Sequence, residues 1–303
     1  MPRPTHLVQR LLPVLSGRGT GRLQTVTKLG ALEVVSAPGF SRLIGKLADS
    51  QVPRPLLRAA IQLYVQHYDV NVDEMEKALE EYDTFDAFFT RRLKPGVHTI
   101  DPDPNVAVSP VDGRVMSFGA VSEGRIEQVK GRDYSIEELL DSQLDAERFQ
   151  QGSFVTLYLS PRDYHRIHSP VSGRITGYRY IPGRLYPVNA TGVKHIDRLF
   201  AVNERIISYV KSSLGEFAVV KVGATNVGKI TLSYHDIQTN DGKRTAYNEQ
   251  LKRPASIERG AELGTFHLGS TVVVLASNAN LKLLVSEAHE TFRVGVPLFR
   301  KAD

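Results

Sequence analysis

A short internal repeat constrains the fold of this chain more than any other feature of its sequence. Residues 109–115 read Ser-Pro-Val-Asp-Gly-Arg-Val, and residues 169–175 repeat them as Ser-Pro-Val-Ser-Gly-Arg-Ile. In each copy a proline is expected to enter a tight turn, and a glycine three residues later is expected to supply the positive φ that such turns need. Because repeated supersecondary units tend to stack on one another, the sequence predicts two equivalent turns that lie together in space.

The segments around the repeat predict a mostly β domain. From about residue 106 to the C-terminus, short β-branched stretches alternate with Gly, Pro and Asp turns. Turns of the repeated kind resemble those of lipoyl- and biotinyl-type sandwich folds. Carrier domains of that type attach their cofactor to a lysine at the turn tip, but the two tips here read Val111-Asp112 and Val171-Ser172. We therefore expect the sandwich architecture without the carrier function.

The first 95 residues differ from the rest and predict helices. Apolar side chains recur at three- and four-residue spacings over residues 40–68, with a break near Pro53 and Pro55. The basic residues interspersed among them are Arg42, Lys46, Arg54 and Arg58. We expect two short amphipathic helices, which suit either the protein's own core or an anionic lipid surface. Thr84 is a residue type that favours the N-cap position, so a further helix is expected to begin there.

Composition excludes several kinds of site. The 303 residues include no cysteine, which rules out disulfides, thiolate metal sites, cysteine nucleophiles and iron–sulfur clusters. The formal charge is +5, and the chain before Glu33 is basic without an acidic residue, so we expect an anionic partner near that end. No apolar run approaches the roughly 20 residues that span a bilayer. We expect a soluble or peripheral protein, although the basic start also suits an organelle transit peptide.

These patterns predict an α+β fold in which N-terminal amphipathic helices precede a mostly β catalytic domain with duplicated lipoyl/biotinyl-like sandwich turns. Residues 1–39 are expected to form a basic N-terminal extension, residues 40–95 a helical segment that docks on membrane, and residues 96–303 the β-rich catalytic domain. With 41% apolar and 23% charged residues, the composition is typical of a folded protein with a substantial core.

The densest polar segment is residues 158–170, which contains His165 and His168. Two histidines three residues apart suit a metal site, a proton relay, or one catalytic residue beside one structural residue. A metal site would need further ligands, but the other histidines are scattered and form no HExxH-like frame. We therefore expect no metal ion.

A possible nucleophile lies near the C-terminus, where Leu268-Gly269-Ser270-Thr271 runs directly into an apolar stretch. By itself this is the pattern of a turn followed by a strand. A serine after a glycine, however, faces an unhindered carbonyl, so a deprotonated Ser270 hydroxyl could attack Gly269. Such an attack needs a base and an acid that orients it. His168 precedes the second repeat and Asp112 lies in the first, so stacked turns would bring acid and base together.

Six segments in chain order resemble phosphatidylserine decarboxylases. They are Phe88-Phe89-Thr90-Arg91, Ser109 to Gly113, Tyr158 to Pro170, Leu199-Phe200 with Asn203-Glu204-Arg205, Val222-Gly223-Ala224, and Leu263-Gly264 with Leu268 to Thr271. Any one of them is a weak signal, but the ordered set is specific and extends from about residue 40 to residue 299. The first 35 or so residues show no such resemblance.

The resemblance implies a proenzyme that cleaves itself between Gly269 and Ser270. Asp112 would orient His168, and His168 would activate Ser270 against the Gly269 carbonyl. The ester formed would eliminate to a dehydroalanine, which hydrolyses to a pyruvoyl group and ammonia. The products would be a long β chain, residues 1–269, and a short α chain, residues 270–303, which remain associated.

The resemblance also implies the reaction and its setting. The pyruvoyl group derived from Ser270 would be the cofactor of a carboxy-lyase, and its Schiff base with phosphatidylserine would yield phosphatidylethanolamine and carbon dioxide. His165 would act in decarboxylation or return a proton to Cα. We expect a homodimer bound peripherally to anionic lipid at the cytoplasmic face of a bacterial inner membrane, in phospholipid biosynthesis, with no nucleic-acid partner.

Four other classes stay open on the sequence alone. A self-processing decarboxylase of a related amine head group would share all of these residues. A serine hydrolase would use the same side-chain types, but the chain lacks a Gly-x-Ser-x-Gly motif. A phosphocarrier or zinc peptidase of the duplicated sandwich type would explain the repeat but not residues 268–271. A structural or membrane-binding module would not require Asp112, His168 and Ser270 together.

Overall fold

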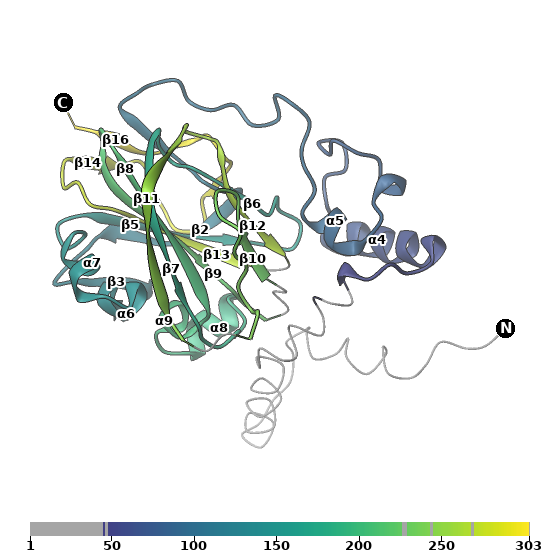
Figure 1. Ribbon diagram of the computed structural model, residues 1–303, viewed down its shortest axis with the longest axis horizontal. Coiled ribbons are helices and arrows are strands. Elements are labelled where there is room, and N and C mark those ends of the chain that lie inside the picture. Colours follow the sequence, from purple (N-terminus) through teal and green to yellow (C-terminus); the bar gives the residue numbers. More distant parts are fainter. Residues whose placement is uncertain (1–44, 46–47, 226–228, 243–244, 268–269, 303) are drawn as a thin grey trace, which may run out of the picture.

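The computed structural model describes residues 45, 48–225, 229–242, 245–267 and 270–302, and for Ser270 it describes the backbone (Figure 1). Three features predicted from the sequence lie outside these residues. They are the basic extension at residues 1–39, the basic pair Arg42 and Lys46, and Gly269 of the predicted cleavage site. Among the described residues, no helix is both long enough and apolar enough to cross a membrane.

The N-terminal helical segment has one long helix in its described part, α4 (Arg54–Tyr68). A proline at the start of α4 suits the first helical turn, and Asp69 ends the helix in a left-handed conformation. The short helices η2 (Leu79–Glu81) and α5 (Phe85–Phe89) follow. The predicted N-cap at Thr84 is confirmed, since its Oγ1 accepts a hydrogen bond from Ala87 N at 3.0 Å.

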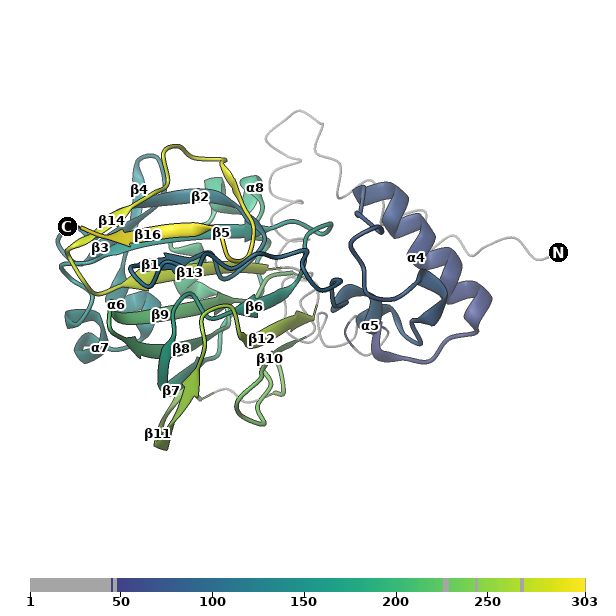
Figure 2. The ribbon, with the colours of Figure 1, turned by 90° about the horizontal axis from the view of Figure 1, so that it is seen from above.

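The helices pack around a small apolar cluster of their own. Its buried members are Leu57, Ile61, Met75, Tyr82 and Phe88. Figure 2 shows α4 and α5 at one end of the molecule, on the side where β6, β12 and β10 lie. The spacing of apolar residues on α4 determines which face of the helix is buried, and Leu57 and Ile61 lie on that face.

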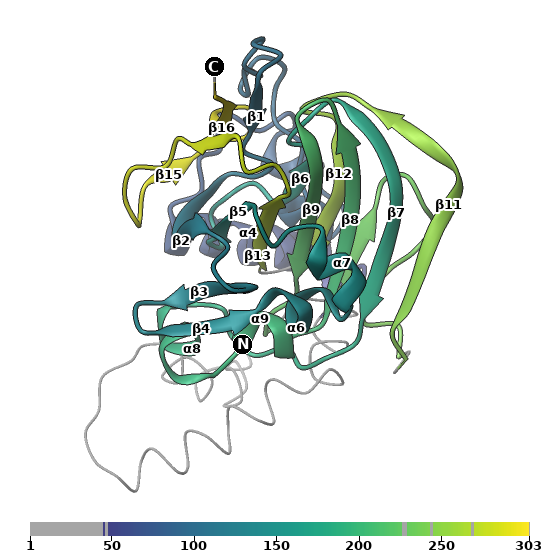
Figure 3. The same ribbon diagram turned by 90° about the vertical axis from the view of Figure 1, so that its left-hand side faces the viewer.

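The rest of the chain is mostly β structure, as the sequence predicts for an α+β protein. An antiparallel sheet of eight strands has the order β11-β7-β8-β9-β13-β5-β2-β15. Its strands are β2 (Gly113–Ala120), β5 (Ser153–Leu159), β7 (Gly173–Ile181), β8 (Arg205–Ser212), β9 (Gly215–Val222), β11 (Tyr247–Ile257), β13 (Ser270–Ala276) and β15 (Thr291–Phe292). Figure 3 shows this sheet curving from β11 through β7, β8 and β9.

Smaller sheets and short helices complete the domain. Two three-stranded sheets have the orders β1-β16-β14 and β10-β12-β6, and β3 pairs with β4. The strands are β1 (Val106–Val108), β3 (Arg125–Val129), β4 (Arg132–Ser135), β6 (Arg166–His168), β10 (Lys229–Leu232), β12 (Glu262–His267), β14 (Leu281–Leu283) and β16 (Pro297–Lys301). The helices are α6 (Ile136–Leu140), α7 (Gln143–Glu147), α8 (Ala190–His195) and α9 (Leu199–Val202).

The main core surrounds β13, the strand that begins at Ser270. Residues 271–276 of this strand are buried and pair with β5 on one side and β9 on the other. A strand that is buried on both faces requires the continuous apolar run that the sequence has from Val272 to Ala276. Ser270 therefore lies where a fully buried strand emerges at the edge of the core.

The two copies of the sequence repeat adopt equivalent positions and meet. In each copy a short strand (β1 or β6) leads into the turn and a long strand (β2 or β7) leaves it. Val108 N donates a hydrogen bond to Pro170 O at 2.9 Å, and His168 N donates to Pro110 O at 2.8 Å. Each copy thus binds the proline carbonyl of the other, as the prediction of stacked turns requires.

Candidate active site

The stacked turns bring the residues predicted for self-cleavage to one end of the main sheet, where β2 and β13 begin and β5 ends. Asp112 immediately precedes β2, and the neighbouring strand β5 ends there at Leu159. Ser270 begins β13, where its backbone pairs with Leu159. Since neighbouring strands lie about 4.8 Å apart, Gly113 of β2 and Ser270 are separated by two strand spacings, about 10 Å. His168 ends β6, directly before the second turn.

The hydrogen bonds of His168 determine which ring nitrogen can act as a base. Its Nδ1 lies 2.7 Å from the carbonyl oxygen of Gly260, which can only accept, so Nδ1 carries the proton. Its Nε2 is therefore the acceptor, and the Tyr164 hydroxyl donates to it at 3.1 Å. Burial lowers the pKa of His168, which keeps the ring neutral. The ring thus presents a single basic nitrogen, Nε2.

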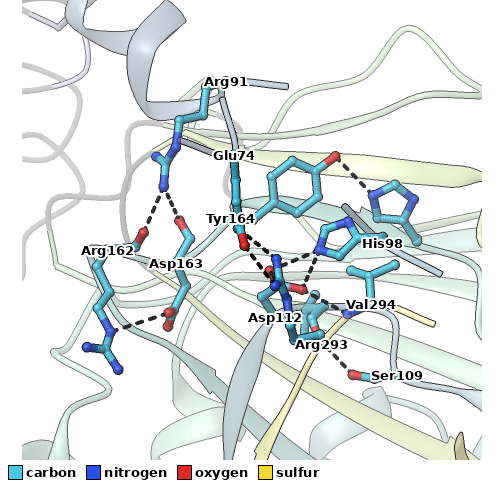
Figure 4. A network of polar contacts seen from close by, with 12 residues as sticks. Glu74, Arg91, His98, Ser109, Asp112, Arg162, Asp163, Tyr164, Arg293 and Val294 are labelled. Atoms are coloured by element: carbon cyan, nitrogen blue, oxygen red, sulfur yellow. Dashed lines mark hydrogen bonds and ion pairs between the residues drawn. The ribbon is translucent and has the colours of Figure 1, made fainter. Parts of the chain in front are cut away.

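Asp112 has a different histidine as its partner. Nε2 of His98 lies 2.8 Å from Oδ1 of Asp112 and 3.0 Å from Oδ2, and the backbone N of Val294 donates to Oδ1 at 2.8 Å. Nε of Arg293 is 3.7 Å from Oδ2. Figure 4 shows these groups converging on the carboxylate. Among the described contacts no hydrogen bond joins Asp112 to His168, so Asp112 influences that ring through its charge.

His165, the second predicted histidine, lies in a separate and more deeply buried environment. It is completely buried, and its ring stacks on Phe89 with 4.1 Å between centroids and 21° between planes. Burial is the main reason why the pKa of His165 is lowered to about 3, and the charge of Arg91 lowers it further. His165 is therefore neutral at physiological pH.

The helical segment holds the loop that carries both histidines. Tyr64 of α4 donates to Pro161 O at 2.9 Å. Arg91 Nη2 donates to the carbonyls of Arg162 and Asp163 at 2.7 and 3.1 Å (Figure 4). At the start of β6, the strand that follows this loop, Arg166 Nε donates to Thr90 O at 2.9 Å. The Phe-Phe-Thr-Arg segment thus positions the histidine loop as well as packing in the core.

A cavity of about 320 Å³ adjoins this loop. Its polar lining includes Arg91, Asp112, Arg162, Tyr164 and Arg293. A larger open cavity of about 1140 Å³ lies elsewhere, beside Tyr178, His235 and Glu249, and contains none of the residues predicted for catalysis. The smaller cavity is therefore the one next to the candidate chemistry. Within the described part of the chain, no group of three or more His, Cys, Asp or Glu side chains could hold a metal ion.

Sequence reasoning missed three groups at this site. Tyr164 lies inside the polar segment 158–170, but nothing in the sequence assigns its hydroxyl to His168. His98 lies 14 residues before Asp112, and Gly260 lies 92 residues after His168. Gly260 contributes a backbone carbonyl, which no side-chain pattern can reveal. A single aromatic or imidazole residue before a polar segment is common in protein sequences, so this feature does not identify His98 as a site residue.

Comparison with known proteins agrees with the resemblance seen in the sequence. The family model for phosphatidylserine decarboxylase matches residues 85–299. A phosphatidylserine decarboxylase proenzyme of Brevibacillus brevis is 44% identical over 255 residues, which cover 84% of this chain and 90% of that protein. The proenzyme of Myxococcus xanthus is 44% identical over 252 residues, 83% of this chain and 89% of its own length.

A third relative extends the match further. The phosphatidylserine decarboxylase proenzyme of an Anaeromyxobacter species is 40% identical over 274 residues, which cover 89% of this chain and 96% of that protein. These relatives are matched over nearly their whole length, and the residues that the family model matches include Asp112, His165, His168 and Ser270. The chain therefore belongs to the phosphatidylserine decarboxylase family, whose members are decarboxylases of the carboxy-lyase class named as proenzymes.

Proposed function

We propose that this chain is a phosphatidylserine decarboxylase proenzyme that cleaves itself between Gly269 and Ser270. The observation that carries the proposal is the state of His168. Its Nδ1 donates to Gly260 O, which leaves Nε2 as the basic nitrogen. His168 contacts the turn that leads into β2, and β2 lies two strands from β13, which begins at Ser270. Burial disfavours the protonated ring, so His168 is available to take the proton of Ser270 and activate it against Gly269.

Asp112 supports this step by its charge. Its carboxylate, held by His98 and Val294, lies in the turn that stacks on the one following His168. When His168 accepts a proton, a nearby negative charge stabilises the resulting imidazolium. In the proposed mechanism Asp112, His168 and Ser270 form the self-cleavage triad, and Gly260 O orients the imidazole directly.

Cleavage would leave the two products interlocked. The short product, residues 270–303, would contain β13, β14, β15 and β16. Strand β13 pairs with β5 and β9, β15 pairs with β2, and β16 pairs with β1, all of which belong to the long product. Breaking one peptide bond at the start of β13 removes none of these pairings. We therefore expect α and β chains to remain associated.

The mature enzyme would carry a covalent pyruvoyl group derived from Ser270. This carbonyl supplies an electron sink for the loss of carbon dioxide from phosphatidylserine, which leaves phosphatidylethanolamine. The start of β13 fits such a group because the strand behind it is buried and rigidly paired. His165, fixed against Phe89, is the proposed residue that acts on the substrate during decarboxylation or, once it has taken up a proton, returns that proton to substrate Cα.

The substrate is a membrane lipid, so we propose that residues 40–95 dock on an anionic membrane. Leu56 and Leu63 of α4 are 62% and 68% exposed, and Arg54 and Arg58 lie on the same helix. Exposed leucines beside basic residues suit the boundary between lipid head groups and acyl chains. The protein would be peripheral, at the cytoplasmic face of the cell membrane, and a homodimer.

Denaturing electrophoresis with intact-mass measurement tests the central proposal. Wild type should give two chains, residues 1–269 and a pyruvoyl-blocked 270–303, while Ser270→Ala and His168→Ala should remain single chains of 303 residues. Ser286→Ala, an exposed serine in the same short product, is the matched control and should be processed normally. Wild-type protein that is folded but keeps an intact chain with an unmodified Ser270 would contradict the proposal, and so would hydrolase activity without cleavage.

A further inference from the structure

Arg293 lies between two carboxylates that hold it in different ways. Its Nη1 and Nη2 donate to Oε1 and Oε2 of Glu74 at 2.9 and 2.8 Å, which makes a bidentate pair. Its Nε lies 3.7 Å from Oδ2 of Asp112, close enough for an ion pair but too far for a hydrogen bond. Figure 4 shows both carboxylates beside this guanidinium. The two terminal nitrogens of Arg293 are therefore used for Glu74 and not for Asp112.

The backbone keeps Arg293 next to Asp112. The following residue, Val294, donates its N–H to Oδ1 of Asp112 at 2.8 Å. Arginine favours planar bidentate contacts with carboxylates. Without Glu74, a rotation of the Arg293 side chain would bring its guanidinium onto Asp112. This pairing would compete with His98, whose Nε2 lies 2.8 Å from Oδ1 of Asp112.

The charges in this group determine how much negative charge faces His168. Two carboxylates share one guanidinium, so one negative charge is left over. The rings of His98 and His168 lie 6.4 Å apart between centroids, so a charge held at His98 acts on His168 from close by. The Asp112 charge favours a proton on His168. An Asp112 paired with Arg293 alone would lose most of that effect.

Other charged and titratable groups also face His168, and they come from several parts of the chain. They are Tyr164 of the histidine loop, His98, Asp112 of the first turn, and Glu262 of β12 with its partner Arg166 of β6. Glu262 favours a proton on His168, but Arg166 Nη1 lies 2.9 Å from its Oε2 and offsets its charge. The Asp112 group is therefore the source of negative charge that a change at Glu74 can alter.

We propose that Glu74 is a positioning residue for the self-cleavage triad, because it holds the Arg293 guanidinium away from Asp112. Asp112 then keeps its carboxylate for His98 and its charge for His168. The role in cleavage rests on the proposed function, but the arrangement itself involves only residues 74, 98, 112, 168, 293 and 294. Glu74 belongs to the helical segment of residues 40–95, so this segment would set the charge beside the base of the catalytic domain.

Two variants should move the protonation of His168 in opposite directions. Glu74→Gln removes a negative charge and frees Arg293 for Asp112, so the pH at which half of the His168 rings are protonated should fall by about half a unit. Arg293→Gln removes the positive charge beside Asp112, so this midpoint should rise by a similar amount. Nuclear magnetic resonance of histidine-labelled full-length protein in the uncleaved Ser270→Ala background measures the midpoint, and His168→Gln assigns the signal.

The double variant, Glu74→Gln with Arg293→Gln, removes both charges and leaves Asp112 to His98. Its midpoint should return to near that of the parent. Such a return distinguishes charge positioning from damage to packing, because two structural losses would add to each other and would not cancel.

A matched control is Asp133→Asn. It removes a carboxylate that accepts a hydrogen bond from Arg125 Nε at 2.8 Å, and Asp133 has no described contact with His168. The midpoint should stay at the parent value in this variant. A shift equal to that of Glu74→Gln would show a general effect of losing any carboxylate and would overturn the proposal.

The remaining outcomes separate this inference from the proposed function. Single variants that shift the midpoint in the same direction, or not at all, would overturn the role of Glu74. If Glu74→Gln fails to fold, an unmoved midpoint in Arg293→Gln overturns it instead. If the protein unfolds in acid before His168 is protonated, the acid limb of the pH–rate profile of cleavage in the Ser270 protein gives the same comparison. If wild type is never cleaved although the opposite shifts occur, the proposed function fails and the charge arrangement stands.

Discussion

His98 binds the carboxylate of Asp112, with 2.8 Å between Nε2 and Oδ1, although sequence reasoning paired Asp112 with His168. His168 instead donates to Gly260 O and accepts from Tyr164. The two imidazole rings lie 6.4 Å apart between centroids. The orienting role of Asp112 stays a prediction. In this arrangement Asp112 would act on His168 through its charge and through His98, whose ring lies beside that of His168.

The first prediction concerns His98. His98→Phe keeps a ring against Tyr164 but removes the donor to Asp112, so the partly buried carboxylate loses a hydrogen bond that water replaces poorly. We expect slower cleavage and, in the uncleaved Ser270→Ala background, a loss of roughly 1–3 kcal/mol in the free energy of unfolding. His195→Phe, at an exposed position on α8, is the control. Equal behaviour of the two variants would exclude the role of His98.

The second prediction concerns the burial of His165. Its pKa is about 3 in the folded protein and has an ordinary value of 6.5, so the stability it contributes is complete above pH 6.5 and falls as pH drops toward 3. At pH 4 the loss amounts to roughly 3 kcal/mol. Urea unfolding of Ser270→Ala should therefore show a drop between pH 6.5 and 4 that is much smaller when His165→Gln is added. A pH dependence that survives this substitution would contradict the assignment.

The third prediction concerns Lys221, a buried amine whose described partners are Ser208 Oγ at 2.6 Å and Val219 O at 3.3 Å. Burial lowers its pKa to about 7, so stability is complete above pH 10.5 and falls as pH drops toward 7. Lys221→Met should raise stability at pH 7, by as much as roughly 4 kcal/mol, and flatten the profile between pH 7 and 10.

Urea titrations of the uncleaved protein at pH 7 and pH 9.5 measure this effect. Lys211→Met, at an exposed position on β8, serves as the control and should change stability little. If Lys221→Met is less stable than its parent at pH 7, the buried amine is better satisfied than its two neutral partners indicate.

The fourth prediction separates cleavage from decarboxylation. Phe89→Leu removes the ring that stacks on His165 at 4.1 Å but touches no described partner of His168. We expect normal processing and a reduced rate of carbon dioxide release from phosphatidylserine, because His165 loses its fixed orientation. Phe85→Leu, on the same helix but not stacked on His165, is the matched control. If the two variants release carbon dioxide at equal rates, Phe89 does not orient His165 for decarboxylation.

The fifth prediction tests membrane docking by α4. Leu56→Glu with Leu63→Glu, or charge reversal of Arg54 and Arg58, should weaken co-sedimentation with vesicles that contain anionic phospholipid. Leu144→Glu is the control, because Leu144 is 74% exposed but lies on α7, at the other end of the molecule from α4 (Figure 1). If the α4 substitutions leave vesicle binding unchanged, α4 is not the docking surface. The same conclusion follows if Leu144→Glu weakens binding equally.

Local sequence chemistry accounts for much of the fold. The repeat forms two turns, but the prediction that its glycines supply a positive φ is wrong, since neither Gly113 nor Gly173 has one. A glycine is needed there because a Cβ would meet the backbone carbonyl of Tyr158 or Lys211 on the neighbouring strand. The apolar run after Ser270 requires a strand that is buried on both faces. Thr84 caps α5 because its side-chain oxygen reaches a backbone N–H three residues on. The sequence predicted two helices broken near Pro53 and Pro55. Residues 45, 48 and 49 are helical, residues 51–53 are not, and α4 begins directly after Pro53.

The sequence by itself determined the repeat, the buried strand that begins at Ser270, and the residue types that the family resemblance assigns to catalysis. These features depend on backbone preferences and side-chain chemistry within a few residues. Only the tertiary structure decided that Asp112 binds His98, that Nδ1 of His168 donates to Gly260 O, and that Nε2 of His168 accepts from the Tyr164 hydroxyl. Such partners are chosen where loops from distant parts of the chain pack together, because a buried polar group bonds to whichever donor or acceptor the packing places within about 3 Å.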